Sequence, residues 1–484
     1  MADAMTSITP QRRFSNKISK FSAALVMTAG VAVLGYFALP VSAQIAVRNQ
    51  GYIPFSEPPI NYRTQEPTDP VALLQKRLDE GKASLVYDEK DHGYLKSVLD
   101  LLKVPVDSQT LVFSKTSFQY TKISPEHPRA LYYNDDVYVG SVHDGKTIEL
   151  VSFDPMQGAM FYLVDEKKVD KPVFQRAELD CTQCHVASGT RGIPGVLLRS
   201  VKPVRTGSLL ARAKTFISDQ ETALKDRWGG WYVTGSLAKG SLANTVFSQP
   251  QASDGTPPAE AAPSPLGQAY DAKSYLAPGS DQVALLVLAH QTQMHNLITL
   301  TNYKTRLGLH ALAQEKGGVA DPASSLASLP EKTRDQILKP AEQLLRYLLF
   351  VNETPLGGID ARQAIAESAF AREFAARGEK DSKGRSLREF DLHDRTFKYP
   401  CSYLIYSSAF DSIPDPARLY VYHRLLEVLS GEDKSADFAS LSGADKQAIL
   451  TILLETKPGL PQEWLDYAHT NHLRTATQVA GRER

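Results

Sequence analysis

The residues best suited to do chemistry stand together at Cys181, Cys184 and His185, in the run Cys-Thr-Gln-Cys-His. Two cysteines in a C-x-x-C spacing, followed directly by histidine, form the attachment signature of c-type haem. In such a motif the thiols add to the porphyrin vinyl groups as thioethers, and the imidazole becomes an axial iron ligand. The spacing therefore predicts one covalently attached haem c, with His185 as its proximal ligand.

A C-x-x-C pair has other known uses, namely a redox dithiol, a structural disulfide or half of a zinc site. The chain has three cysteines, so the second pair that a zinc ribbon needs is missing. A thioredoxin-like pair would open a helix near the N-terminus and would not adjoin a histidine. Cys401 lies among apolar and aromatic residues, which favours a buried inert thiol; thiolate ligation of haem iron is the alternative.

Residues just after the motif are candidates for supporting the haem. Pro194 offers a carbonyl that could accept the second N–H of His185 and so fix its tautomer. Arg191 and Arg199 could pair with the haem propionates. A simple surface turn is the competing interpretation of this segment.

The sixth iron position largely decides what a haem protein does. No methionine lies at the downstream spacing where a small cytochrome carries its ligand. Instead, the run 290–296 brings together His290, Met294 and His295, and on a helix the first two share a face. These three residues are the candidate distal ligands, with His143 and His310 as weaker ones. Histidines hydrogen-bonded within a helical core are the alternative.

The N-terminal 43 residues predict export. A basic segment that includes Arg12 and Arg13 precedes an uncharged apolar stretch over 21–39, and Val41-Ser42-Ala43 has the small residues that a signal peptidase recognises. An uncleaved membrane anchor is the alternative, because the apolar stretch is about long enough to span a bilayer. Either way, we expect a periplasmic or other extracytoplasmic protein.

Composition narrows the choice of partners. The chain of 484 residues has 54 basic and 54 acidic residues, which gives a formal net charge of zero. A nucleic-acid partner would require a basic domain or stripe, so none is expected. The expected partner is a redox protein or a small-molecule electron donor or acceptor.

The hydrophobic patterns predict an α+β fold, with an antiparallel sheet in the N-terminal part, a haem-bearing central segment and a mainly α-helical C-terminal half. Alternating patterns place strands near 110–113, 130–133, 137–140, 148–153 and 160–164. The expected divisions are a signal peptide or anchor over 1–43, a leader with short helices over 44–107, a β-rich part with the haem motif over 108–248, a flexible insertion over 249–265, and a helical domain over 266–484.

Capping residues predict where the main helices begin. Asp69-Pro70 is expected to start a helix that runs to about Gly81. The later helices are expected to start at Ser280, Asp360, Asp415 and Ser442. The predicted helix that starts at Asp360 runs through Phe370 and Phe374.

The motif after an apparent leader resembles the cytochrome c superfamily. The wider chain resembles large, mostly uncharacterised mono-haem cytochrome c domain proteins of bacteria, on the segments 174–185, 227–235, 290–296 and 400–403. This resemblance implies haem attachment through Cys181, Cys184 and His185. The chain departs from small cytochromes in its size, in the position of the motif and in the missing downstream methionine.

Three functions therefore compete. The first is electron transfer through a haem with two strong axial ligands. The second is a peroxidase- or oxygenase-like haem enzyme with an open or weakly held sixth site, and its catalytic residues are not identified by the sequence. The third is a scaffold or sensor in which the helical half serves as a docking surface.

Overall fold

The structure, a computed structural model, describes residues 53–90, 92–248, 262–357 and 360–476. Pro54–Arg484 forms one compact unit. Met1–Ile53 is a separate unit of which only Ile53 is described, so the predicted signal over 1–43 lies outside the described residues. Within the described ranges, no helix combines the length and the apolar character needed to cross a bilayer.

A seven-stranded antiparallel sheet occupies the N-terminal part, in the order β6-β5-β4-β3-β2-β1-β9. Its strands are β1 (Thr110–Val112), β2 (Arg129–Tyr133), β3 (Val137–Ser141), β4 (Thr147–Asp154), β5 (Gly158–Asp165), β6 (Gln175–Arg176) and β9 (Trp231–Tyr232). The predicted strands are confirmed, and so is the α+β class. The edge strand β9 comes from the aromatic block 227–235, whose Trp228 and Trp231 are buried in the core.

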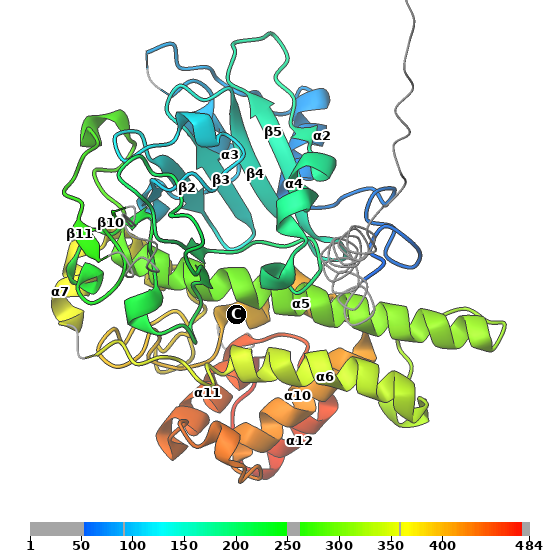
Figure 1. Ribbon diagram of the computed structural model, residues 1–484. Helices are drawn as coiled ribbons and strands as arrows, with labels where there is room; N and C mark the ends of the chain where they lie inside the picture. The colour runs from blue at the N-terminus through cyan, green and yellow to red at the C-terminus, as the bar shows by residue number, and fades with distance from the viewer. Residues whose placement is uncertain (1–52, 91, 249–261, 358–359, 477–484) are drawn as a thin grey trace, which may run out of the picture. The chain divides into compact units, whose positions relative to one another are not determined.

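Alternation along the strands gives the sheet two buried faces. On one face, the Tyr133 hydroxyl donates to the Ala284 carbonyl (2.6 Å) in the long helix α5 (Gln282–Glu315). On the other face, the Tyr162 hydroxyl donates to Asp69 (2.6 Å) at the start of α2 (Pro70–Asp79), beside the short α3 (Leu95–Leu101). The sheet therefore lies between α5 and the two N-terminal helices, as Figure 1 shows.

Helix α5 is the central element of the unit. It runs for 34 residues, and its first 22 residues, Gln282–Tyr303, are all buried. Figure 1 shows it crossing between the sheet and the C-terminal helices. Its N-cap is Asp281, whose carboxylate accepts from the backbone N–H groups of Val283 and Ala284, and not Ser280 as predicted. Ser280 instead accepts from the Leu111 backbone N–H (2.9 Å), which joins the helix start to β1.

The C-terminal half is helical, as predicted. Its helices are α6 (Glu331–Leu348), α7 (Ala361–Glu367), α8 (Ala369–Ala376), α9 (Ser408–Asp411), α10 (Asp415–Ser430), α11 (Gly443–Thr456) and α12 (Gln462–Thr470). The expected continuous helix after Asp360 is wrong, because Ser368 is in an extended conformation, ends α7 and caps α8. The predicted Ser442 cap is confirmed as a capping box with Asp445.

Two small ribbons complete the unit. One pairs β7 (Arg199–Ser200) with β8 (Phe216–Ile217), and the other pairs β10 (Thr245–Phe247) with β11 (Pro263–Pro265). Pro263–Pro265, at the end of the predicted insertion over 249–265, thus forms a paired strand. Residues 249–261 lie outside the described residues. One hydrophobic core cluster joins the sheet, α5 and the C-terminal helices.

Candidate functional site

The motif lies on a short helix, α4 (Glu178–His185), which follows the edge strand β6. Its first residue is anchored, because the Glu178 carboxylate pairs with Arg63 (3.1 Å) and Arg176 (3.1 Å). The backbone N–H of Ala177, just before the helix, donates to the Phe161 carbonyl of β5 (2.9 Å). Helix α4 is thus held against the edge of the sheet, as Figure 1 shows.

The two motif cysteines lie one helical turn apart and share a side of α4. Cys181 is half-buried against the hydrophobic core, whereas Cys184 is exposed, and both are free thiols. Burial, helped by the Glu149 and Asp180 carboxylates, raises the pKa of Cys181 to about 12. A redox dithiol needs a thiol with a lowered pKa, so this environment argues against that use of the pair.

His185 is held as a metal-binding histidine would be. Its Nδ1 lies 2.8 Å from the carbonyl oxygen of Gly195, and because a carbonyl only accepts, Nδ1 carries the proton. Nε2 therefore keeps the lone pair, and the one hydrogen bond that the ring makes among the described residues is the Nδ1 bond to Gly195. Burial lowers the pKa of His185, which favours the neutral imidazole that ligates metals. The ring also packs against Phe161, with centroids 5.0 Å apart.

The predicted partner of His185 is corrected by one residue, from Pro194 to Gly195. The reason lies in the loop geometry, because the Gly195 N–H also donates back to the His185 carbonyl (3.0 Å). The Thr190 hydroxyl braces the loop from within by donating to the Ile193 carbonyl (2.8 Å). Pro194 is buried in this loop, but its carbonyl is not the acceptor.

Helix α5 fixes this loop from outside. The Asn296 side chain accepts from the Val196 N–H (3.1 Å) and donates to the Val196 carbonyl (2.7 Å). A Cβ atom on Gly195 would lie 2.3 Å from Asn296 Oδ1, so only glycine allows this approach. The acceptor of the His185 N–H is therefore positioned by a residue about 100 positions downstream.

The arginines predicted near the haem lie on the same segment. Arg191 has a left-handed backbone (φ 59°), and its Nε is buried without a hydrogen-bond partner in the described part of the chain. The buried Nε–H of Arg191 is therefore available as a donor to an anionic group such as a carboxylate. Arg199 is half-buried in β7, and its carbonyl accepts from the Trp231 indole (2.8 Å).

His290, a predicted distal ligand, has both ring nitrogens committed inside the core. Nδ1 lies 2.7 Å from Gln220 Oε1, and Nε2 lies 2.7 Å from Ser402 Oγ. The ring also stacks on Phe350, with centroids 4.4 Å apart. Because neither nitrogen is left for iron, the structure places His290 as a packed core residue, which was the alternative interpretation.

The other candidates on α5 are also buried away from solvent. Met294 is a fully buried member of the core cluster. His295 Nε2 lies 2.8 Å from the Asp135 carbonyl, and the ring stacks on Phe153 at 3.9 Å. Its Nδ1 is buried and has no partner among the described residues. His310 is half-buried farther along α5.

Sequence reasoning missed the charged pair beside the motif. Arg129 on β2 and Glu149 on β4 form an ion pair (2.6 Å) on the sheet face that faces α5. Half-exposed apolar side chains, Leu131 and Leu163, lie on the same face. The sequence signal was available only through the strand register, which places positions 131, 140 and 149 side by side and brings Arg129, two residues before 131, within reach of Glu149 on the same face.

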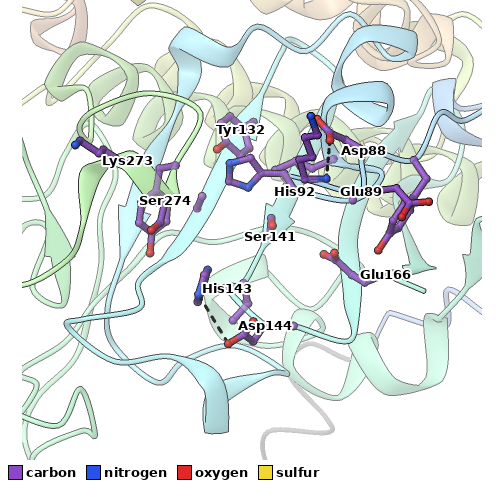
Figure 2. Close-up of a pocket in the computed structure, with 18 residues that line it drawn as sticks. Asp88, Glu89, His92, Tyr132, Ser141, His143, Asp144, Glu166, Lys273 and Ser274 are labelled. Atoms are coloured by element: carbon purple, nitrogen blue, oxygen red, sulfur yellow. Dashed lines mark hydrogen bonds and ion pairs between the residues drawn. The ribbon is translucent and has the colours of Figure 1, made fainter. Parts of the chain in front are cut away.

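The other face of the sheet has a polar pocket of about 540 Å³. Figure 2 shows His92, His143 and Glu166 among the side chains that line it. His143, a weaker distal candidate, stacks on His127 here, with centroids 5.1 Å apart. Because Ala130 and Tyr132 of the lining alternate with Arg129 and Leu131, the sheet separates this pocket from the motif.

Comparisons with protein-family models, with curated proteins and with solved structures found no match. Among the described residues, no group of three or more histidine, cysteine or acidic side chains could hold a metal ion. The functional argument therefore depends on the local chemistry of Cys181, Cys184 and His185.

Proposed function

We propose that this chain is an exported c-type cytochrome with one haem c, attached through Cys181 and Cys184 and ligated by His185, and that it transfers single electrons. The observation that carries the proposal is the state of His185. A neutral ring with its Nδ1 proton directed at the Gly195 carbonyl and a free Nε2 is what a haem-ligating histidine requires.

The residues around the motif have separate roles in this proposal. The bound haem supplies one-electron chemistry, and the protein supplies attachment, orientation and electrostatics. Cys181 and Cys184 anchor the ring by thioether bonds, and Gly195 orients His185. Arg191 offers its unpaired donor to a haem carboxylate.

A second candidate is a haem enzyme of the peroxidase or oxygenase kind. It is favoured by the contacts of the α5 histidines, because both nitrogens of His290 and Nε2 of His295 are already bonded within the fold. A sixth position without a strong protein ligand is open to small molecules. Met294 then serves as a core residue.

Haem attachment is tested by producing the full chain in a host that matures c-type cytochromes. We expect a c-type pyridine haemochrome and haem that stays with the chain after denaturation. Cys181→Ala should abolish the normal two-bond attachment, whereas Cys401→Ala, the matched control, should retain it because Cys401 is buried in the core. A normally folded wild-type protein without haem would overturn the proposal.

Electron transfer and enzyme activity differ in the ligand field. Electron transfer predicts a low-spin ferric spectrum that cyanide and CO leave unchanged, and Met294→Ala or His295→Ala should then alter it. The enzyme candidate predicts a high-spin ferric spectrum and rapid binding of both ligands. In that case, substitution of Met294 or His295 should leave the spectrum unchanged.

Export is proposed from the sequence over 1–43. Cell fractionation should place the protein outside the cytoplasm, where its partner would be a redox protein or a small electron donor or acceptor. N-terminal sequencing of the purified protein should begin at Gln44 if the signal is cleaved. An intact N-terminus on a membrane-bound protein would instead indicate the anchor.

A further inference from the structure

A half-buried ion pair crosses the sheet beside the motif. Arg129 Nη2 lies 2.6 Å from Glu149 Oε2, and their side chains are only 19% and 14% exposed. The two residues belong to β2 and β4, so the contact passes over the intervening strand β3. Charges with so little exposure are weakly screened by solvent and act on nearby groups.

A glycine in β3 leaves room for the Arg129 side chain to pass over this strand. Gly140 lies opposite Glu149 in the register, and a Cβ atom there would lie 2.4 Å from Arg129 Nη2. Any other residue at position 140 would therefore displace the guanidinium. The arginine side chain can lie across the sheet because β3 has no side chain at this point.

The Glu149 carboxylate also accepts hydrogen bonds from two polar side chains. It accepts from the Ser117 hydroxyl (3.1 Å) and from the Gln119 amide (3.0 Å), which belong to the loop after β1. With Arg129, these donors leave the carboxylate in one orientation. A charge fixed in this way is a permanent feature of the local electric field.

The pair faces the haem motif. His185 packs on Phe161, which lies opposite Val151, and Val151 and Glu149 share one face of β4. The pair therefore lies on the same face of the sheet as the aromatic ring against which the proximal ligand packs.

Resting on the proposed function, we infer that Arg129 and Glu149 are positioning residues that set the reduction potential of a haem attached at Cys181 and Cys184. A positive charge favours the reduced form of the iron centre, and a negative charge favours the oxidised form. In the intact pair the two effects oppose each other. Removal of one partner leaves the other unbalanced, so the two single removals shift the potential in opposite directions.

The test is a potentiometric titration of the haem-loaded full chain, followed by absorbance. Arg129→Gln should lower the reduction equilibrium constant about tenfold, and Glu149→Gln should raise it about tenfold, which is ~59 mV for a one-electron couple. The double variant should remain within about threefold of wild type. A merely structural role would not give shifts of opposite sign, so equal-signed shifts or no shifts overturn the inference.

A matched control is the pair Arg395–Asp445, which has a similar separation (2.7 Å) and similar exposure (28% and 15%) on the helical half. Arg395→Gln should leave the potential unchanged. If a single variant at the sheet does not fold, Arg129→Lys keeps the charge and must stay within about threefold of wild type. A tenfold shift in Arg129→Lys would count against the inference.

The two proposals fail in different ways. A wild-type chain without covalent haem refutes the proposed function. If the wild type carries covalent haem but neither Arg129→Gln nor Glu149→Gln changes its reduction potential, only the role of Arg129 and Glu149 is refuted.

Discussion

The clamp between Asn296 and Val196 gives the most direct test of how the motif is held. Asn296 is fully buried and makes two hydrogen bonds to Val196, which is itself 6% exposed. Asn296→Ala would leave the Val196 N–H and carbonyl without partners. Each buried unsatisfied backbone group costs about 1–3 kcal/mol, so we expect the two groups together to lower the unfolding free energy by about 2–6 kcal/mol.

Urea unfolding of the full chain measures this loss, provided that the dependence on urea has the same slope in both proteins. Amide exchange at Val196 should also become faster, because its donor is freed. The matched control is Asn471→Ala, which removes an exposed bond to the Tyr467 carbonyl (2.9 Å) and should change the stability by less than about 0.5 kcal/mol. If Asn296→Ala is no more destabilising than this control, the clamp contributes nothing and the argument is wrong.

Three further predictions concern other parts of the fold. Burial, helped by the charge of His295, lowers the pKa of His290 to about 3, so the fold binds the neutral ring. The contribution of His290 to the unfolding free energy is therefore complete above about pH 6.5 and is lost as the pH falls. His290→Gln should therefore lose stability less steeply than wild type between pH 6 and 4, by about 1.4 kcal/mol per pH unit in urea titrations, and parallel curves would contradict this. Burial and the charge of Asp165 raise the pKa of Glu166 to about 7, so the ionisation of Glu166 destabilises the fold as the pH rises. Glu166→Gln should therefore raise the unfolding free energy at pH 8 by about 1 kcal/mol, a figure reduced because Glu166 is partly exposed. At pH 4, where the carboxyl is protonated, the same substitution should leave the melting temperature unchanged. Gly431 ends α10 in a left-handed conformation (φ 81°), so Gly431→Ala should cost about 1 kcal/mol in thermal unfolding, whereas Gly443→Ala, where φ is not positive, should cost less.

Local features of the chain could be predicted from the sequence because their causes are local. Asp69 caps α2 with its own carboxylate, which accepts from an N–H only two residues away, and α10 begins at Asp415 as predicted. The alternating strands of the hairpins followed from their side-chain period alone. The fold class could therefore be predicted before any tertiary contact was known.

The support of the motif could not be predicted, because it depends on contacts that are remote in sequence. Nothing near Gly195 in the sequence indicates that Asn296 will bind the neighbouring residue, Val196. Arg129 and Glu149 meet only after two hairpins set their register. His290 shares a helix face with Met294 as predicted, but Gln220 and Ser402 bind both of its nitrogens.

Helix α5 supports the motif loop from about 100 residues downstream, and this has a consequence for the order in which the chain can mature. Synthesis runs from the N-terminus, so the residues through Gly195 exist well before Asn296 does. During that interval the chain already contains Gly195, the local partner of His185, whereas Asn296, which supplies the outer clamp on the loop, is missing. On the proposed function, haem attachment at Cys181 and Cys184 can therefore precede the packing of α5, which completes the support of the loop.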